Sequence, residues 1–371
     1  LKLRTSYTEV GSPITQIGIT PGTVTDPMSG GVINPISTYP YPDFKPERTK
    51  SYEVGINARF LNGRISFDGT FYQSNTYNQT FLSVMSPATG YSGFYVQAGN
   101  VRNRGVEMTL GYTDTFGKVN YSTHLTYTAN KNKIVEMVHD YRNPIDNSLV
   151  NITELTLKEA GGVYLREGYS MSDVFTTGIL QRGRDGRLVE EGTGYQVDRT
   201  QRIRLGSADP DFTMGWRHDI SYKNLSLGLM ITGRFGGIVT SQTQAFMDAF
   251  GVSKVSAEAR DNGGVMLDGH RYDAERYYNT VGGQGLMGYY TYDATNIRLQ
   301  ELSLTYSLPK KWLGNVFNNA AISFVGRNLF MFYHKAPFDP DMNGSTGTYN
   351  RSDFFMAPSL RNLGFSIKFS L

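Results

Sequence analysis

The sequence predicts an all-β protein, a transmembrane antiparallel β-barrel, from three observations. Apolar and polar residues alternate in about ten runs along the chain, with the period of two that β-strands have. Short and long connections between these runs take turns, as they do in outer-membrane barrels. The polar faces also carry charges, which a soluble sandwich would bury at a cost of several kcal/mol for each unpaired ion. These charged positions are Glu53, Arg59, Arg64, Asp68 and Glu107.

The predicted strands follow from the alternation, run by run. They are Leu1–Val10, Ser51–Phe60, Arg64–Tyr72, Gly105–Thr113, Val119–Thr128, Phe212–Ser221, Leu225–Thr232, Asn296–Ser307, Ala321–Tyr333 and Arg361–Leu371. In the last run, Leu363, Phe365, Ile367 and Phe369 share one face, which we expect to look out at lipid. Two runs change face, one after Leu299 and one across Gly326, and a β-bulge is the ordinary cause of such a change.

The connections have two lengths. The short ones are LNG after Phe60, DTFGK after Thr113 and KN after Tyr222, and PKKWLGNVFNN after Leu308 is of middling length. The long ones are residues 11–46, 73–103, 134–210, 236–292 and 335–358. Short turns of such barrels face the periplasm and long loops face outside. Within one long loop, Ser241–Asn262 has apolar residues at helical spacing and predicts a short helix.

Composition excludes several other classes. The 371 residues contain 25 Tyr, 21 Phe and 41 Gly, and no window approaches the ~18 apolar residues that a membrane helix needs. A net charge of +3 does not favour nucleic acid, and the absence of cysteine excludes disulfides. No nucleophile motif is evident, so we predict no enzyme activity and no cofactor other than the calcium considered below. GQGLMG at 283–288 matches a nucleotide-binding pattern but lacks the strand–turn–helix around it, and is predicted to be a flexible loop.

Longer segments resemble a known family. They are Pro46–Gln79, Gly90–Tyr112, Gly206–Gly237, Ala294–Pro309 and Val325–Met342. Together they are similar to the SusC-like family of TonB-dependent outer-membrane transporters. The resemblance implies a longer protein, with an N-terminal carboxypeptidase-like domain, a TonB box, a plug and a barrel of ~22 strands. None of the first three matches anything here, so residues 1–371 are expected to be the C-terminal part of the barrel, about ten strands, with long extracellular loops.

The function that this resemblance implies is active import across the outer membrane of a Gram-negative bacterium. The implied partners are a SusD-like surface lipoprotein acting as a lid, the remaining barrel and plug, and the TonB–ExbB–ExbD complex. Outer-membrane lipid and lipopolysaccharide surround the barrel, and dimers of transporter–lid pairs are one implied arrangement. We favour oligosaccharides as substrates because the loops are rich in tyrosine. A peptide importer of the same family and a passive ten-strand porin remain alternatives.

Aromatic residues of the long loops are the candidate substrate-binding residues, because aromatic faces pack on the C–H faces of sugars. The main candidates are Tyr91, Phe94, Tyr95, Tyr289 and Tyr290, and Tyr39, Tyr41, Tyr277 and Tyr278 are further ones. The alternative is that these rings pack loop on loop. On the opposite, lumen-facing side of the sheet, we expect Glu53, Arg59, Arg64 and Asp68 to hold the plug by ion pairs.

Two short motifs complete the predicted sites. DPDMNG places Asp339, Asp341 and Asn343 as in a calcium loop, although the twelfth position is Asn350 rather than glutamate, and an Asx-rich turn is the alternative. The chain end resembles the signal read by the barrel assembly machinery. Its matching residues are Asn362, Gly364, Ile367 and Phe369, while the final residue is Leu371 rather than an aromatic.

Overall fold

The computed structural model describes residues 1–13, 23–26, 32–35, 38–39, 44–142, 148–158, 163–313, 317–341 and 352–370. The chain forms two compact units, each with its own contacts. The first contains Leu1–Thr113 and His124–Ser172, and the second contains Asp114–Thr123 and Asp173–Leu371. Long strands of both units belong to one sheet of ten strands.

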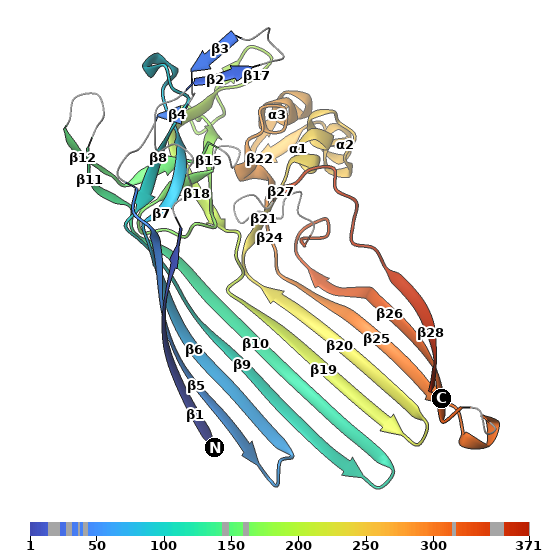
Figure 1. Cartoon of the computed structure of the whole chain (residues 1–371). Coiled ribbons are helices and arrows are strands. Elements are labelled where there is room, and N and C mark those ends of the chain that lie inside the picture. The colour runs from blue at the N-terminus through green and yellow to red at the C-terminus, as the bar shows by residue number, and fades with distance from the viewer. Residues whose placement is uncertain are drawn as a thin grey trace. The chain divides into compact units, whose positions relative to one another are not determined.

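The first unit contributes long antiparallel strands (Figure 1). They are β1 (Lys2–Ser12), β5 (Glu47–Phe60), β6 (Ile65–Tyr77), β9 (Asn100–Phe116) and most of β10 (Val119–Glu136). Neighbours follow the order β1-β5-β6-β9-β10, and the registers from β1 to β9 are antiparallel. The shortest of these strands has 11 residues, about the number that a tilted strand needs to cross a bilayer.

The second unit contributes the remaining strands of the sheet. They are β19 (Phe212–Tyr222), β20 (Leu225–Phe235), β25 (Asn296–Ser307), β26 (Asn319–His334) and β28 (Asn362–Ser370), antiparallel in that order. The first residues of β10 also belong to this unit, where the Thr123 hydroxyl donates to the Arg217 carbonyl of β19 at 2.9 Å. All ten predicted strands are therefore confirmed, and the predicted fold class with them.

The predicted bulges lie in β25 and β26. Pairing between these strands passes from Glu301–Arg327 to Leu299–Phe330, so one residue of β25 faces two of β26. One of those two, Asn328, has a φ of 52°, in the left-handed region that asparagine tolerates better than most residues. The bulge in β26 thus begins two residues after Gly326, which explains the change of face in the sequence.

Short turns join the hairpins at one end of the strands. The turn after β5 contains Asn62 at φ 55° and Gly63 at φ 88°, and the turn after β9 contains Gly117 at φ 63°. A 3-10 helix, η4 (Lys310–Trp312), lies between β25 and β26. Short connections are therefore where the sequence predicts them.

The long connections contain small sheets that the alternation in the sequence does not predict. In the first unit these elements are β2 (Thr23–Asp26), β3 (Val32–Pro35), β4 (Thr38–Tyr39), β7 (Gln79–Val84), η2 (Pro87–Thr89), β8 (Gly93–Ala98), β11 (Val138–Arg142), β12 (Leu149–Ile152), β13 (Glu154–Thr156) and β14 (Tyr164–Arg166). In the second unit they are β15 (Asp173–Leu180), β16 (Glu190–Glu191), β17 (Gly194–Tyr195), β18 (Val197–Ser207), β21 (Ile238–Ser241), β22 (Val265–Leu267), β23 (His270–Tyr272), η3 (Met287–Tyr290), β24 (Thr291–Asp293) and β27 (Ser352–Asp353).

Three helices, rather than the one predicted, lie in the second unit between β21 and β24. The predicted segment Ser241–Asn262 forms two of them, α1 (Gln242–Ala249) and α2 (Lys254–Asp261), separated by Gly251 at φ 67°. Each starts after a serine whose side chain accepts a backbone N–H, and α3 (Ala274–Val281) starts after Asp273 in the same way. These caps satisfy N–H groups that a helix start leaves unpaired.

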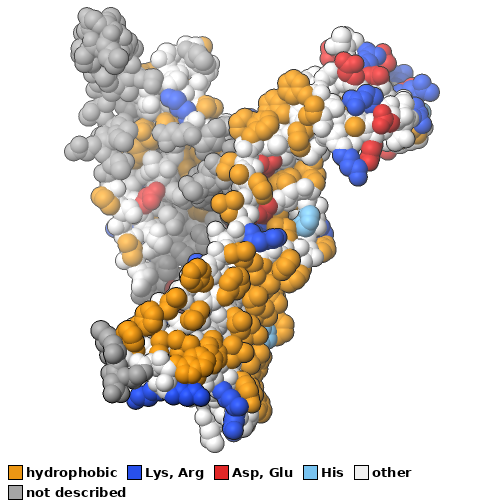
Figure 2. Space-filling view, turned by 90° about the vertical axis from the view of Figure 1, so that its right-hand side faces the viewer, with side chains coloured by type: hydrophobic (Ala, Val, Ile, Leu, Met, Phe, Trp, Pro, Cys, Tyr) orange, Lys and Arg blue, Asp and Glu red, His pale blue; other side chains and the backbone are white. Residues whose placement is uncertain are grey.

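Apolar side chains of the ten-stranded sheet are exposed rather than packed against a second layer. Phe71, Leu110, Leu304, Phe324 and Phe365 are each more than 40 % exposed. Figure 2 shows hydrophobic side chains gathered in a band over the lower part of the view. Among the described residues, no helix is long and apolar enough to cross a membrane. An exposed apolar band on a sheet is the surface that hydrocarbon would cover.

The buried cores lie instead within the long connections. In the first unit, Val96, Met137 and Leu165 of these connections are fully buried, as is Ile134 near the end of β10. In the second unit a larger cluster includes Tyr195, Tyr277, Val281 and Leu286 and contains parts of α1 and α3. The long connections are therefore folded subdomains with cores of their own.

Candidate functional site

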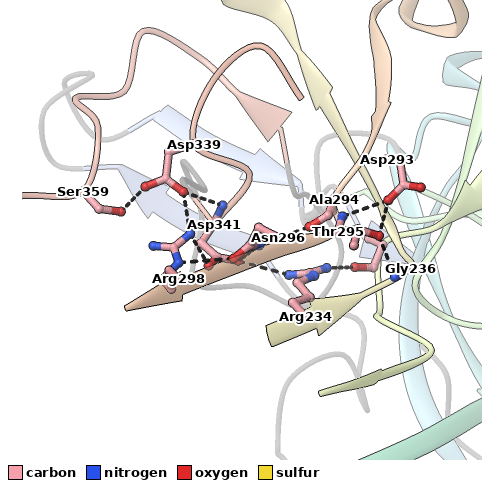
Figure 3. A network of polar contacts seen from close by, with 11 residues as sticks. Arg234, Gly236, Asp293, Ala294, Thr295, Asn296, Arg298, Asp339, Asp341 and Ser359 are labelled. Carbon is pink, nitrogen blue, oxygen red and sulfur yellow. Dashed lines mark hydrogen bonds and ion pairs between the residues drawn. The ribbon is translucent and has the colours of Figure 1, made fainter. Parts of the chain in front are cut away.

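A buried network of charges lies in the second unit at the long-connection ends of β20 and β25 (Figure 3). Arg298 of β25 is at its centre, with only 6 % of its side chain exposed. Its guanidinium contacts Asp339 at 2.9 Å and Asp341 at 2.7 Å. It also donates to the side chains of Asn296 at 3.2 Å and Asn328 at 3.3 Å. The Arg298 guanidinium thus joins β25, β26 and the segment after β26.

The two aspartates are held by further donors. The Ser359 hydroxyl donates to Asp339, and the backbone N–H of Asp341 donates to Asp339 at 3.1 Å. Arg234 of β20 lies 3.7 Å from Asp341 and donates to the Ala208 carbonyl at 2.6 Å. Burial opposes ionisation of Asp339, but the hydrogen bonds from Ser359 and Arg298 outweigh it and lower its pKa. Asp339 is therefore ionised at neutral pH.

A third carboxylate, that of Asp293, fixes the neighbouring connection. Asp293 accepts from the backbone N–H of Thr295 at 2.8 Å and from the Lys335 ammonium at 2.5 Å. The Thr295 hydroxyl in turn accepts from the Gly236 N–H at 3.0 Å. Burial alone would raise the pKa of Asp293. The hydrogen bonds from Lys335 and Thr295 have the larger, opposite effect, so its pKa lies below the ordinary value. These contacts tie Gly236, which follows β20, to the segment before β25, and tie that segment to Lys335, where the next long connection starts.

The structure gives the two candidate calcium ligands other partners. Both Asp339 and Asp341 bind guanidinium groups, which occupy oxygens that a cation would need. Within the described part of the chain, no three His, Cys, Asp or Glu side chains are grouped to hold a metal. The third predicted ligand, Asn343, lies outside the described residues. A calcium site would require the two carboxylates to leave their arginines.

The three main candidate aromatic residues of the first unit lie on or beside β8. Tyr91 packs edge-on against Tyr39 with ring centroids 5.1 Å apart. Phe94 lies 6.1 Å from the Tyr141 ring, and Tyr95 lies 5.5 Å from a phenylalanine ring of the preceding connection. All three stay partly exposed. They pack loop on loop and still present surface, whereas Tyr41 lies outside the described residues.

The second-unit candidates separate into one accessible ring and three buried ones. Tyr289 is 39 % exposed, and its hydroxyl accepts from the Leu180 N–H at 3.1 Å. Tyr290 is only 3 % exposed, and Tyr277 and Tyr278 are 8 % exposed. Burial, and then neighbouring charges and tyrosines, raise the pKa of Tyr290 and Tyr277. The prediction for Tyr290 therefore needs correction, because a ring inside the core cannot stack on a ligand.

The predicted assembly signal lies on β28. Ile367 and Phe369 are exposed on the apolar face, and Phe369 packs against the Phe317 ring at 5.0 Å. An added Cβ at Gly364 would meet nothing within 4 Å. Packing within the described structure therefore does not require glycine at this position. Asn362 pairs with Arg327 of β26. Recognition of this end by the assembly machinery stays a prediction.

Charges on the other face of the sheet are joined across strands. The Arg4 guanidinium of β1 donates two hydrogen bonds to Asp68 of β6, at 2.8 and 2.6 Å, and Asn57 donates to the same carboxylate at 2.8 Å. Arg4 crosses β5 over Gly55, where a Cβ would lie 2.5 Å from Nε of Arg4. Asp68 is thus paired with Arg4 and Asn57 within the sheet itself, which leaves it less able to form the expected ion pair with a plug.

An exposed aromatic cluster, not predicted from the sequence, lies in the second unit. We call Phe246 of α1 with Phe354 and Phe355 the aromatic cluster. The Phe246 ring lies 6.2 Å from Phe354 and 5.8 Å from Phe355, and all three are at least 39 % exposed. The consecutive rings at 354–355 are the sequence signal that could have pointed to it. Exposed apolar clusters outside a membrane band mark contact surfaces.

Comparison with known proteins identifies similar chains. Residues 1–232 match the model of the family described as TonB dependent receptor-like, beta-barrel. TonB-dependent receptor P3 of Formosa agariphila is 24 % identical over 99 % of this chain, and TonB-dependent receptor P26 of the same organism is 25 % identical over 81 %. The chain spans 39 % and 32 % of the lengths of these two relatives.

Two solved structures have the same fold. One is described as the RagAB peptide importer in the closed-closed state, with a TM-score of 0.70 over 99 % of this chain and 40 % of that one. The other is described as the RagAB peptide transporter, with a TM-score of 0.71 over the same shares. Both are 18 % identical to this chain, so the likeness concerns the fold alone.

Proposed function

Because the chain belongs to the TonB-dependent receptor β-barrel family, we propose that it forms the C-terminal part of a SusC-like importer in the outer membrane of a Gram-negative bacterium. The family consists of outer-membrane transporters rather than enzymes. The exposed apolar band on the ten-stranded sheet is the observation that carries the proposal. A plug and further strands complete the transporter, TonB–ExbB–ExbD supplies the energy, and lipid and lipopolysaccharide surround the barrel.

The strand edges support a larger barrel over a ten-strand porin. In the described sheet β1 pairs only with β5, and β28 only with β26. An unpaired edge in hydrocarbon costs several kcal/mol for each unsatisfied group. Additional strands paired with β1 and β28 would remove that cost. A barrel of the relatives' size would provide such strands.

Oligosaccharides are the substrates that we propose. Tyr91, Phe94, Tyr95 and Tyr289 keep partly exposed rings on the long connections, which suit the C–H faces of sugars. Peptides are the second candidate, because the RagAB structures of similar fold are described as a peptide importer.

Uptake by the complete transporter tests this proposal. We expect deletion of its gene to abolish growth of the host on its oligosaccharide substrate, and a protonophore to stop uptake within minutes. Loss of growth on peptides, with growth on oligosaccharides unchanged, would favour a peptide importer. Uptake that is insensitive to the protonophore would contradict active import and favour a passive pore.

A SusD-like lipoprotein is the lid that we propose, and the aromatic cluster is its contact on this chain. Three neighbouring exposed rings on folded connections provide a stable apolar contact of the kind that anchors protein interfaces. Pairing of transporter–lid units into dimers is a further part of the proposal.

Replacing Phe354 and Phe355 together by alanine is expected to reduce co-purification of the lid at least tenfold, because aromatic anchors contribute about 2 kcal/mol or more at interfaces. The measurement is the lid-to-transporter ratio after affinity purification in mild detergent. Phe116→Ala is the matched control, since this ring is also exposed but lies at a short turn. An unchanged ratio in the double variant would remove the cluster from the lid contact.

A further inference from the structure

A cleft of about 510 Å³ opens between the three helices of the second unit. Figure 1 shows α1, α2 and α3 gathered together in this part of the chain. Side chains from all three helices and their ends form its walls, including Asp248, Phe250, Ser256, Arg260, Glu275 and Asn279. Its volume lies in the range of about 300–1,000 Å³ that small-ligand sites have. Neither the sequence motifs nor the family match assigns a role to it.

The helices that form the walls of this cleft are capped and anchored without a ligand. Ser253 caps α2 by accepting from the Ser256 N–H at 3.0 Å, and Asp273 caps α3 by accepting from the Arg276 N–H at 2.8 Å. Tyr277 and Val281 anchor α3 in the buried core on its other side. A site with ordered walls loses little conformational entropy on binding.

The polar groups of the cleft divide into engaged and available ones. Asp248 is 5 % exposed and accepts from the Gln244 side chain at 2.8 Å, and Asp273 is engaged as the cap. Within the described part of the chain, Glu275 and Asn279 are exposed and make no side-chain hydrogen bond or ion pair. Arg260 donates to the Gly251 carbonyl at 3.3 Å and has four further N–H groups.

These available groups have a balanced chemistry. Glu275 accepts hydrogen bonds, Arg260 donates them, and the Asn279 amide does both. The lining as a whole carries three carboxylates, of Asp248, Asp273 and Glu275, against the one guanidinium of Arg260. The cleft therefore does not attract an anionic ligand. Hydroxyl groups, which donate and accept, satisfy such a set.

An exposed aromatic ring completes the lining. Phe250 is 76 % exposed and follows the end of α1, next to Gly251. Covering a water-exposed ring with an apolar face lowers the free energy, because apolar surface is removed from water. The C–H face of a sugar ring provides such a cover and leaves its hydroxyls directed at the polar groups.

We propose that this cleft binds one or two sugar units of a neutral oligosaccharide, as a site on the long connections outside the barrel lumen. Phe250 stacks on a sugar ring, and Glu275, Asn279 and Arg260 bond its hydroxyls. The inference rests on the proposed glycan import and adds a location and named residues to it. Such a site would capture substrate before it enters the lumen.

The test uses the complete transporter in detergent without its lid. Binding is measured by calorimetry with a panel of neutral hexaoses of α- and β-linked glucose, xylose, mannose and galactose, and with tetralysine. We expect at least one hexaose to bind, and Phe250→Ala and Glu275→Gln each to weaken that binding about tenfold or more. Asn279→Ala is a third variant, and circular dichroism confirms the fold of each.

The matched control is Glu258→Gln, which removes the same charge from α2 at a position paired with Lys254 and outside the cleft lining. It should bind as the unaltered protein does. If Phe250→Ala and Glu275→Gln bind the hexaose as tightly as the unaltered protein does, the cleft is not the binding site. Hexaose uptake by cells would in that case still support glycan import. Failure of every hexaose both to bind and to enter cells would refute both proposals, and preferential binding of tetralysine would replace the sugar with a cationic ligand.

Discussion

Arg298→Met is expected to destabilise the transporter by about 3–5 kcal/mol, the usual result of removing one partner from a buried ion pair. Asp339, whose side chain is 9 % exposed, would be left without its guanidinium. Asp341 would lose its 2.7 Å contact, and the connection from 335 onward would keep only the longer 3.4 Å bond from Asn296 as a tie between Asp341 and β25. We therefore expect a lower unfolding midpoint and earlier proteolytic cleavage within residues 335–360.

The measurement is thermal unfolding of the purified transporter, followed by the shift between folded and unfolded mobility in electrophoresis. Arg298→Met with Asp339→Asn should recover part of the loss, because the second change removes the uncompensated charge. Arg184→Met, at an exposed arginine, is the matched control. If Arg298→Met unfolds at the same temperature as Arg184→Met, the network does not hold the connection.

Phe365→Arg is expected to destabilise the folded barrel by about 2–4 kcal/mol, since that is the effect of arginine near the bilayer midplane on a lipid-facing position. Phe365 is 76 % exposed on β28 and pairs with Phe324 of β26. Both residues lie in the apolar band. We expect less assembled protein in the outer membrane and a lower unfolding midpoint in detergent.

Ser366→Arg is the matched control, because the same new side chain is one residue away on the opposite face of β28. Ser366 pairs with Ser323, whose side chain shares a 2.9 Å hydrogen bond with Thr305. That face is polar, and arginine there should change the midpoint little. Equal damage from the two variants would mean that both faces of β28 meet the same medium.

The sequence alone predicts the membrane strands well, because each carries its own periodic signal. Leu363, Phe365 and Ile367 alternate with polar neighbours, and hydrocarbon on one side enforces that alternation at every step. The bulges in β25 and β26 are visible for the same reason, since one extra residue moves the apolar set to the other face.

Structure within the long connections is harder to predict. Strands such as β15 and β18 pair through registers with bulges, and their residues pack in small cores instead of facing a uniform solvent. The helix α3 has a capping aspartate, Asp273, but spans only eight residues, so its periodic signal is weak.

The candidate site combines residues that no local pattern connects. Arg298 and Asp339 are 41 positions apart, and only the fold makes Arg298 the partner of the acidic pair. The DPD motif therefore suggested a metal, although the cation that the structure supplies is a guanidinium. The cleft likewise depends on three helices, of which the sequence indicated one segment.

The central claim is that one face of these strands meets hydrocarbon and the other meets water in a pore. This chain has no cysteine, so single cysteines from 362 to 370 can carry nitroxide labels once any cysteine elsewhere in the transporter is replaced. In reconstituted bilayers we predict that oxygen relaxes labels at 363, 365, 367 and 369, while a water-soluble nickel complex relaxes those at 364, 366, 368 and 370. Equal accessibility to both reagents at every position, or nickel access at the odd ones, would contradict the claim.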